Sequence, residues 1–191
     1  VQYNIAICGP SGVGKSSFIN RILGKHAGEP GAAAVGDTET TLVPTKYDVP
    51  DSALTLVDIP GGGTKKFSAA TYVEDTKIYG CDAIIIMYAG RMMEVCNDIV
   101  EQCDQFKVDI CFVRNKTDLM LDNLRRNERL SPAAALEKAR RIVDKEVLDV
   151  APSAAYKRRF IISNYNMDDG GDPLDFPLLA EFLRNSASRR N

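Results

Sequence analysis

A glycine-rich segment near the start of the chain, Gly9 to Ser16, fits the pattern G-x-x-x-x-G-K-S. It follows a short apolar stretch, Tyr3 to Cys8, which reads as a strand. It precedes an amphipathic stretch, Lys15 to Leu23, which reads as a helix that Gly24 is suited to end. A strand, a glycine-rich loop and a helix in this order belong to sheets whose parallel strands are joined by helices. The segment therefore predicts a phosphate-binding loop on an α/β fold.

Apolar strands and amphipathic helices alternate along the rest of the chain. Strands are expected at 43–48, 54–58, 83–87, 110–113 and 160–163, and helices at 72–79, 94–105, 132–148 and 174–185. The turn at 49–52 is too short for a crossover, so the strands that flank it should be antiparallel. Residues 25–40 lack periodicity and are expected to form a loop. We expect a P-loop NTPase three-layer sandwich: a mixed, mostly parallel six-stranded sheet with helices on both faces, in a single domain over residues 1–191.

Composition narrows the class of protein further. The net charge of −2 gives no reason to expect the basic stripe that marks a nucleic-acid-binding protein, so we expect no nucleic-acid partner. The five cysteines show no C-x-x-C spacing, which favours a reducing compartment over a disulfide framework. The longest apolar run is far shorter than the roughly 20 residues of a membrane-spanning helix. These features indicate a cytoplasmic protein.

The chemistry of the glycine-rich segment is phosphate binding. Glycines let the loop curl so that its N–H groups, together with the N-terminus of the following helix, point at one phosphate. Lys15 brings a positive charge to the β- and γ-phosphates, and the Ser16 hydroxyl is a hard oxygen ligand for Mg²⁺. We expect the phosphates to be bound by Gly9, Ser11, Gly12, Val13, Gly14, Lys15, Ser16 and Ser17.

A second motif, Asp58-Ile59-Pro60-Gly61, ends the expected strand at 54–58. An aspartate at this place holds Mg²⁺ through water, and the Gly61 N–H is available to the γ-phosphate. A switch protein also needs a threonine on the loop before the second strand. Thr38, Thr40 and Thr41 all qualify by spacing.

A third motif, Asn115-Lys116-Thr117-Asp118, follows the expected strand at 110–113. The Asp118 carboxylate can accept hydrogen bonds from guanine N1–H and the exocyclic amine, and adenine has no matching pair of donors. The Lys116 stem can cover the ring, and Asn115 can tie this loop to the phosphate loop. Ser163 and Asn164 close the last strand, where a loop under the base is expected. Asp118 favours a GTPase over an ATP-dependent kinase on the same fold.

With these motifs in place, the sequence resembles the G domain of the interferon-inducible, immunity-related GTPases. The resemblance runs over nearly the whole chain. It is carried by the stretches GPSGVGKSSFIN, GDTETT, DIPGGG, TYVEDTKIYGCD, IIIMYAGR, FVRNKTD, FIISNYN and DFPLL. The stretches TYVEDTKIYGCD and DFPLL lie outside the general GTPase motifs and are therefore the specific ones. The chain departs from the pattern in having NKTD where many members carry TKxD.

The resemblance implies several properties that the motifs alone do not. Thr41 corresponds to the magnesium-binding switch threonine, and Glu39 to a switch glutamate implicated in GTP hydrolysis within nucleotide-dependent dimers. Lys15 places the chain with the lysine-type members. The helical domain that members build from segments flanking the G domain is absent from this sequence, so membrane association is expected only through those segments. The resemblance also implies a cytoplasmic protein that is peripheral on intracellular membranes when complete and has a role in cell-autonomous immunity.

The weak point of the site is the hydrolytic step. Gly62 follows Gly61 where small Ras-like GTPases have a water-orienting glutamine. We therefore expect slow turnover that rises when a second copy completes the site, with Lys15, Glu39, Thr41 and Gly61 as the catalytic residues. The chain has no obvious internal arginine finger, although Arg91 follows the expected strand at 83–87 and could be tested. The alternative is a nucleotide-gated binding module with negligible turnover.

Overall fold

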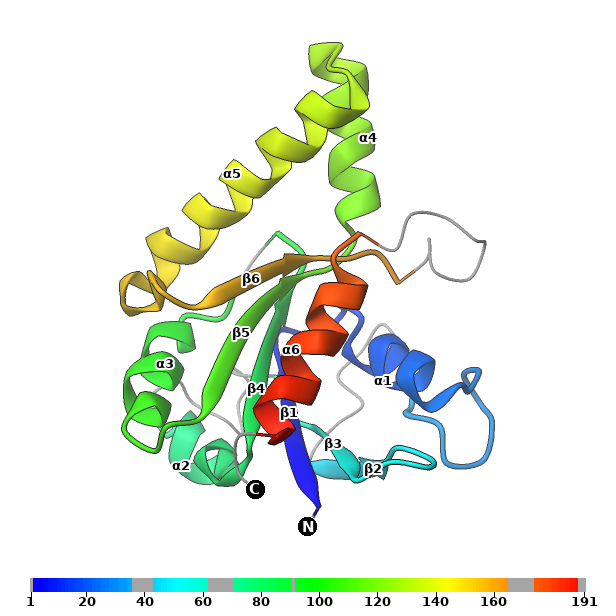
Figure 1. Ribbon diagram of the computed structural model, residues 1–191, viewed down its shortest axis with the longest axis vertical. Helices are drawn as coiled ribbons and strands as arrows, with labels where there is room; N and C mark the ends of the chain where they lie inside the picture. Colours follow the sequence, from blue (N-terminus) through cyan, green and yellow to red (C-terminus); the bar gives the residue numbers. More distant parts are fainter. Residues whose placement is uncertain (1, 36–42, 62–70, 91, 165–173, 189–191) are drawn as a thin grey trace.

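The sheet has the expected strands in a mostly parallel order. The computed structural model describes residues 2–35, 43–61, 71–90, 92–164 and 174–188. Within these ranges a six-stranded sheet has the order β2-β3-β1-β4-β5-β6, and every pair is parallel except β2 with β3 (Figure 1). The strands are β1 (Tyr3–Cys8), β2 (Thr45–Asp48), β3 (Leu54–Asp58), β4 (Ala83–Tyr88), β5 (Asp109–Arg114) and β6 (Arg158–Ile161). The predicted mixed sheet and its antiparallel β2–β3 pair are confirmed.

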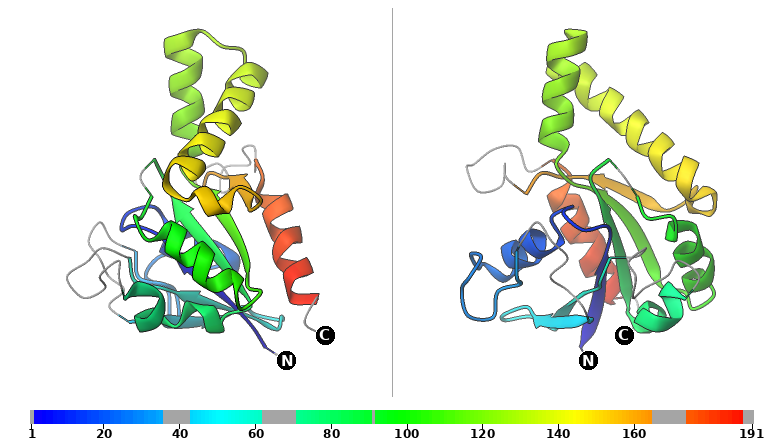
Figure 2. Two further views of the ribbon diagram at one scale, coloured as in Figure 1. Left: turned by 90° about the vertical axis from the view of Figure 1, so that its left-hand side faces the viewer. Right: turned by 180° about the vertical axis from the view of Figure 1, so that it is seen from behind.

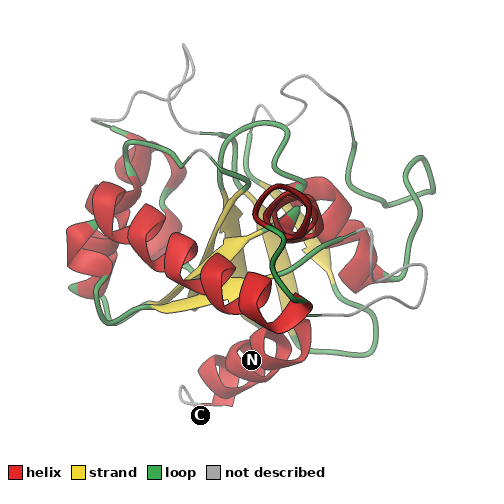
Figure 3. Cartoon of the chain, turned by 90° about the horizontal axis from the view of Figure 1, so that it is seen from above, coloured by secondary structure: helices red, strands yellow, loops and turns green. Residues whose placement is uncertain are grey.

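Helices cover both faces of the sheet, which makes three layers (Figure 3). One face carries α1 and α6, and the other carries α2, α3 and the C-terminal part of α5. No helix in the described part of the chain is long and apolar enough to cross a membrane. The helices are α1 (Lys15–Leu23), α2 (Tyr72–Thr76), α3 (Cys96–Asp104), α4 (Thr117–Glu128), α5 (Pro132–Val150) and α6 (Phe176–Ser188), with 3₁₀ turns at Ile78–Gly80 and Pro152–Ala154.

The two-residue period of the strands divides the core in two. In β4, Ile84 and Ile86 pack with the α2–α3 side, whereas Ile85 and Met87 pack with α1 and α6. Both sets are fully buried, as central parallel strands require, because successive side chains point to opposite faces. This alternation fixes the register of the sheet and hence the positions of the loops that follow each strand.

A helical hairpin is the feature that the sequence analysis missed. Residues 117–128 form α4, which packs against the first half of α5 and projects with it away from the sheet (Figures 1 and 2). Leu124 packs with Ala135 and Ala139 in a small core of its own. The apolar residues of α4 thus serve a local helix–helix contact. The first residue of α4, Thr117, belongs to the NKTD motif, so in the sequence this helix looks like a continuation of the motif's loop.

Element boundaries shift by a few residues in other places. The helix expected at 72–79 breaks at Lys77, whose φ of 52° is left-handed, and continues as a 3₁₀ turn. The helix expected from residue 94 begins at Cys96. The expected helix end at Gly24 is confirmed, since Gly24 ends α1 at φ 65°. At the start of α5, Ser131 caps the helix by accepting a hydrogen bond from the Ala134 N–H at 3.3 Å.

Candidate functional site

The predicted motifs follow the ends of parallel strands at one edge of the sheet. The glycine-rich loop follows β1, Asp58 ends β3, Asn115 follows β5, and Ser163 lies just beyond β6. Carboxyl ends of parallel strands share an edge, and loops at this edge form the ligand crevice of open α/β sheets. The sheet therefore brings together segments that are far apart in sequence.

Two glycines of the phosphate loop are required by close backbone approach. A Cβ on Gly9 would lie 2.0 Å from the carbonyl oxygen of Met87 in β4. Gly14 has a φ of 94°, and a Cβ there would lie 2.5 Å from Nδ2 of Asn115. Any side chain at either position would push the loop off the sheet or away from the base motif. These contacts explain why the loop has glycine at both ends of its pattern.

The N-terminus of α1 is suited to an anion. Within the described residues no side chain caps this helix end, and its first turn contains no acidic residue. The N–H groups there and the positive end of the helix dipole favour a negative ligand. The Lys15 ammonium is folded over the loop, where Nζ donates to the carbonyls of Gly9 at 2.9 Å and Pro10 at 3.0 Å. Ser16 and Ser17 follow in the same turn and are half-buried.

The Asp58 motif is held by a tyrosine that the sequence analysis did not select as a site residue. Asp58 is only 1% exposed and pairs with Ile7 of β1, and Gly61 is buried as well. The hydroxyl of Tyr72 in α2 donates to the carbonyl of Pro60 at 2.8 Å, deep in the core. This bond fixes the backbone one residue before Gly61. The signal in the sequence was the stretch TYVEDTKIYGCD, which supported the family resemblance but was given no role at the site.

Asn115 joins three segments of the site. Its Nδ2 donates to the carbonyl of Val13 at 2.9 Å, which is the tie between base motif and phosphate loop that the sequence analysis expects. Its Oδ1 accepts the Asn164 N–H at 3.2 Å, and Nδ2 of Asn164 donates to the Gly14 carbonyl at 3.1 Å. Asn164 thus has a positioning contact that its place in the sequence did not reveal.

In the base motif and just after β6, Oδ1 of Asp118 and Oδ1 of Asn164 are buried acceptors with no hydrogen-bond partner among the described residues. Asp118 lies in the first turn of α4, and Lys116 precedes it in a left-handed conformation at φ 57°. Buried acceptors are normally satisfied, so these two oxygens are available to donors of a bound ligand. A guanine offers such donors at N1–H and at the exocyclic amine, and the residues present fit that base.

Part of the predicted site lies outside the described residues. This holds for Glu39 and Thr41, for the competing threonines Thr38 and Thr40, and for Gly62 and Arg91. Their roles stay predictions. Of the three expected magnesium ligands, Ser16 and Asp58 are described; both supply hard oxygens, the donor type that suits Mg²⁺.

Comparison with known proteins assigns the chain to a family. The model of the family described as interferon-inducible GTPase (IIGP) matches residues 1–189. Interferon-inducible GTPase 5 of Rattus norvegicus is 32% identical over 185 residues, which cover 93% of this chain and 38% of that protein. T-cell-specific guanine nucleotide triphosphate-binding protein 2 of Mus musculus is 38% identical over 121 residues, or 63% of this chain and 29% of that protein. The chain thus spans less than half the length of these relatives.

Solved structures agree on the fold. The FeoB G-domain from Methanococcus jannaschii has a TM-score of 0.55 at 14% identity, with 98% of both chains covered. Aquifex aeolicus Era, in a structure bound to GDP and AlF4⁻, has a TM-score of 0.56 at 18% identity and covers 94% of this chain and 55% of its own. At these identities the likeness concerns the P-loop α/β fold, which confirms the predicted fold class.

Proposed function

Because the chain belongs to the interferon-inducible GTPase family, we propose that it binds GTP with Mg²⁺, hydrolyses it to GDP and phosphate, and does so faster when a second copy docks on the nucleotide. The main support for this proposal is the base site, where Asp118 has a buried acceptor with no partner among the described residues. Asn115 of the same motif holds the phosphate loop. The Asp118 carboxylate can accept from guanine N1–H and from the exocyclic amine together, a pair of donors that adenine does not offer.

The phosphates are bound by the loop and the N-terminus of α1. On GTP binding, the Lys15 ammonium exchanges the carbonyls of Gly9 and Pro10 for phosphate oxygens, which are stronger acceptors because they are charged. This exchange needs only a rotation of a flexible four-carbon stem. Lys15 then offsets negative charge that builds on the transferring phosphoryl group.

Magnesium would be held by the hydroxyls of Ser16 and Thr41 and, through water, by the Asp58 carboxylate. When bound, the ion neutralises charge on the β- and γ-phosphate oxygens. Asp58 is buried at the end of β3, so its carboxylate is held in place by the sheet. Gly61 follows on the turn that Tyr72 fixes through Pro60, and its N–H is available to the γ-phosphate.

The hydrolytic step is completed by self-association. Gly62 offers no side chain to orient the attacking water, and alignment and charge stabilisation supply most of the catalysis in phosphoryl transfer. Glu39 precedes Thr41 by two residues in the sequence, so we expect it on the γ-phosphate side, where a second copy can lock it in place. The second candidate is a nucleotide-gated binding module, which the missing glutamine favours.

Phosphate release, measured per molecule over a wide dilution series with GTP and Mg²⁺, tests the proposal. Specific activity should rise with protein concentration, and Glu39→Ala should bind GTP normally but lose about a hundredfold of the assisted rate, as removal of one transition-state contact does. Glu29→Ala, a change of an exposed carboxylate earlier in the same loop, is the matched control. Activity that is negligible at every concentration would favour the binding module.

The family also supports a proposed role in cell-autonomous immunity, carried out by a longer protein of which this chain is the nucleotide-binding part. We expect that protein in the cytoplasm and peripherally on intracellular membranes, with membrane contact made by segments outside this sequence. Imaging of the complete protein before and after interferon treatment, compared with the chain 1–191 alone, tests both statements. Equal membrane association of the complete protein and of the chain 1–191 would contradict the expectation that segments outside this sequence make the membrane contact.

A further inference from the structure

Asp175 is bonded to the end of β6, next to the base-site residues Ser163 and Asn164. It directly precedes α6, and its side chain is only 4% exposed. Its backbone N–H donates to the carbonyl of Ile161 at 3.0 Å, and its Oδ2 accepts the Ile161 N–H at 3.0 Å. These two bonds join the end of β6 to the start of α6. Ile161 lies two residues before Ser163, so the start of α6 is held close to the base-site residues.

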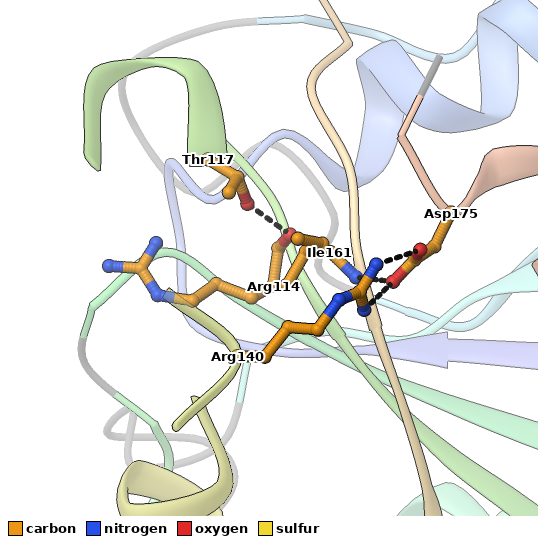
Figure 4. A network of polar contacts seen from close by, with 5 residues as sticks. All are labelled: Arg114, Thr117, Arg140, Ile161 and Asp175. Carbon is orange, nitrogen blue, oxygen red and sulfur yellow. Dashed lines mark hydrogen bonds and ion pairs between the residues drawn. The ribbon is translucent and has the colours of Figure 1, made fainter. Parts of the chain in front are cut away.

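An arginine from the helical hairpin holds the same carboxylate. Arg140 of α5 donates from Nη1 to Oδ2 of Asp175 at 2.8 Å and from Nη2 to Oδ1 at 2.7 Å (Figure 4). The hydrogen bond to Asp175 raises the pKa of Arg140 above its usual value. A buried carboxylate is tolerated when it is paired and fully hydrogen-bonded, and the parallel two-bond geometry fixes the relative orientation of both groups. The hairpin is thereby attached through Asp175 to the end of β6 and the start of α6.

The residues beside this ion pair bind the base motif directly. The Ile162 N–H donates to the carbonyl of Arg114 at 2.8 Å, and the Ile162 carbonyl accepts the Thr117 N–H at 3.2 Å. The Thr117 hydroxyl donates to the same Arg114 carbonyl at 3.0 Å (Figure 4). A shift of Ile161 would therefore move the backbone that positions Asn164 and Asp118 relative to the base.

We propose that Asp175 and Arg140 are positioning residues for guanine: their ion pair fixes the backbone just after β6, at Ser163 and Asn164, and attaches the α4–α5 hairpin to the nucleotide site at a second point. The first point is Thr117, where α4 begins inside the base motif. Two attachments make the hairpin orientation and the base-site geometry interdependent. The inference rests on the proposed function, since it presupposes that the site binds a guanine nucleotide.

The main test compares Arg140→Ala with Arg141→Ala, its neighbour on the same helix, whose side chain is largely exposed and pairs with Glu137. Fluorescent GDP dissociation is followed by stopped flow, and GDP preference over ADP is measured by competition. Loss of Arg140 should speed dissociation about tenfold and lower the GDP preference by a similar factor, the usual size of coupling between linked sites. Arg141→Ala should match the parent in both.

Two further variants separate positioning from general destabilisation. Arg140→Lys keeps the charge but loses the two-bond geometry and should be intermediate. Asp175→Asn keeps an acceptor for Ile161 and should also be intermediate. If Arg140→Ala and Arg140→Lys only lower the melting temperature, with the parent's GDP preference and dissociation rate intact, the positioning role is wrong while the proposed function stands. If the parent protein itself does not prefer GDP over ADP, the result contradicts the proposed function and not only the positioning role.

Discussion

The side-chain amide of Asn115 donates a hydrogen bond to the backbone carbonyl of Val13 at 2.9 Å, across 102 residues of sequence. The same side chain accepts the Asn164 N–H. One buried amide therefore connects the phosphate loop, the base motif and the loop after β6. Phosphate binding and base recognition depend on each other through this residue.

Replacing Asn115 by alanine should loosen the whole site. The Val13 carbonyl and the Asn164 N–H would both lose a partner, and an unsatisfied buried polar group costs about 1–3 kcal/mol of stability. Urea unfolding should show that loss, and GDP should dissociate faster. Asn127→Ala on the exposed side of α4 is the control and should stay within about 0.5 kcal/mol of the parent. If Asn115→Ala had the stability and GDP dissociation rate of the parent, the Asn115 hydrogen bonds would not stabilise the site.

Asp118→Asn should remove the preference for guanine. The amide replaces one acceptor by a donor, so it opposes the exocyclic amine of guanine but matches the 2-carbonyl of xanthine. Discrimination built on such a hydrogen-bonded pair can reach or exceed about a hundredfold. Competition among GDP, XDP and ADP for parent and variant measures the change. Equal binding of GDP and ADP by the parent would contradict the guanine assignment itself.

Tyr72→Phe should weaken GTP binding more than GDP binding. The variant keeps the buried ring but leaves the Pro60 carbonyl without the hydroxyl that now lies at 2.8 Å, at a cost of about 1–3 kcal/mol. The affected backbone precedes Gly61, which serves the γ-phosphate. Affinities for a non-hydrolysable GTP analogue and for GDP, with unfolding midpoints, test this. Tyr156→Phe is the control, because that hydroxyl bonds Asp104 at the surface and water can replace the bond.

The buried thiols should make the protein less stable above about pH 9. Burial raises the pKa of Cys96 and of Cys103 from 9.0 to about 12. The folded protein keeps these thiols protonated between the two values, whereas the unfolded chain releases the protons. Their contribution to the free energy of unfolding is thus complete below pH 9 and falls as pH rises toward 12.

Urea titrations from about pH 8 to about pH 10.5 measure this effect, and Cys96→Ala should show a shallower decline than the parent. Alkylation gives a second readout. All five cysteines are buried, so they should react slowly in the native protein and fully in guanidinium chloride. Fast native alkylation at pH 8 would contradict the burial of the thiols.

The strands and the phosphate loop could be predicted because their signals are local. Ile84 to Met87 form a continuous apolar run, and Gly9 to Ser16 form a contiguous pattern, so neither needs knowledge of distant residues. The α4 helix could not be recognised in the same way. Its apolar residues pack on α5, and Leu119 remains 59% exposed, so the stretch lacks the buried face that marks a helix covering the sheet.

The sequence by itself determined the order of motifs, the class of ligand and the family, because each motif binds its part of the nucleotide through neighbouring residues. Tertiary structure alone decided how the motifs are held together. Asn164 reaches Gly14 across 150 residues, Tyr72 of α2 reaches Pro60 just after β3, and Arg140 reaches Asp175 from the projecting hairpin. Such contacts depend on strand register and on the direction in which each helix packs, and these follow from the burial of the whole core.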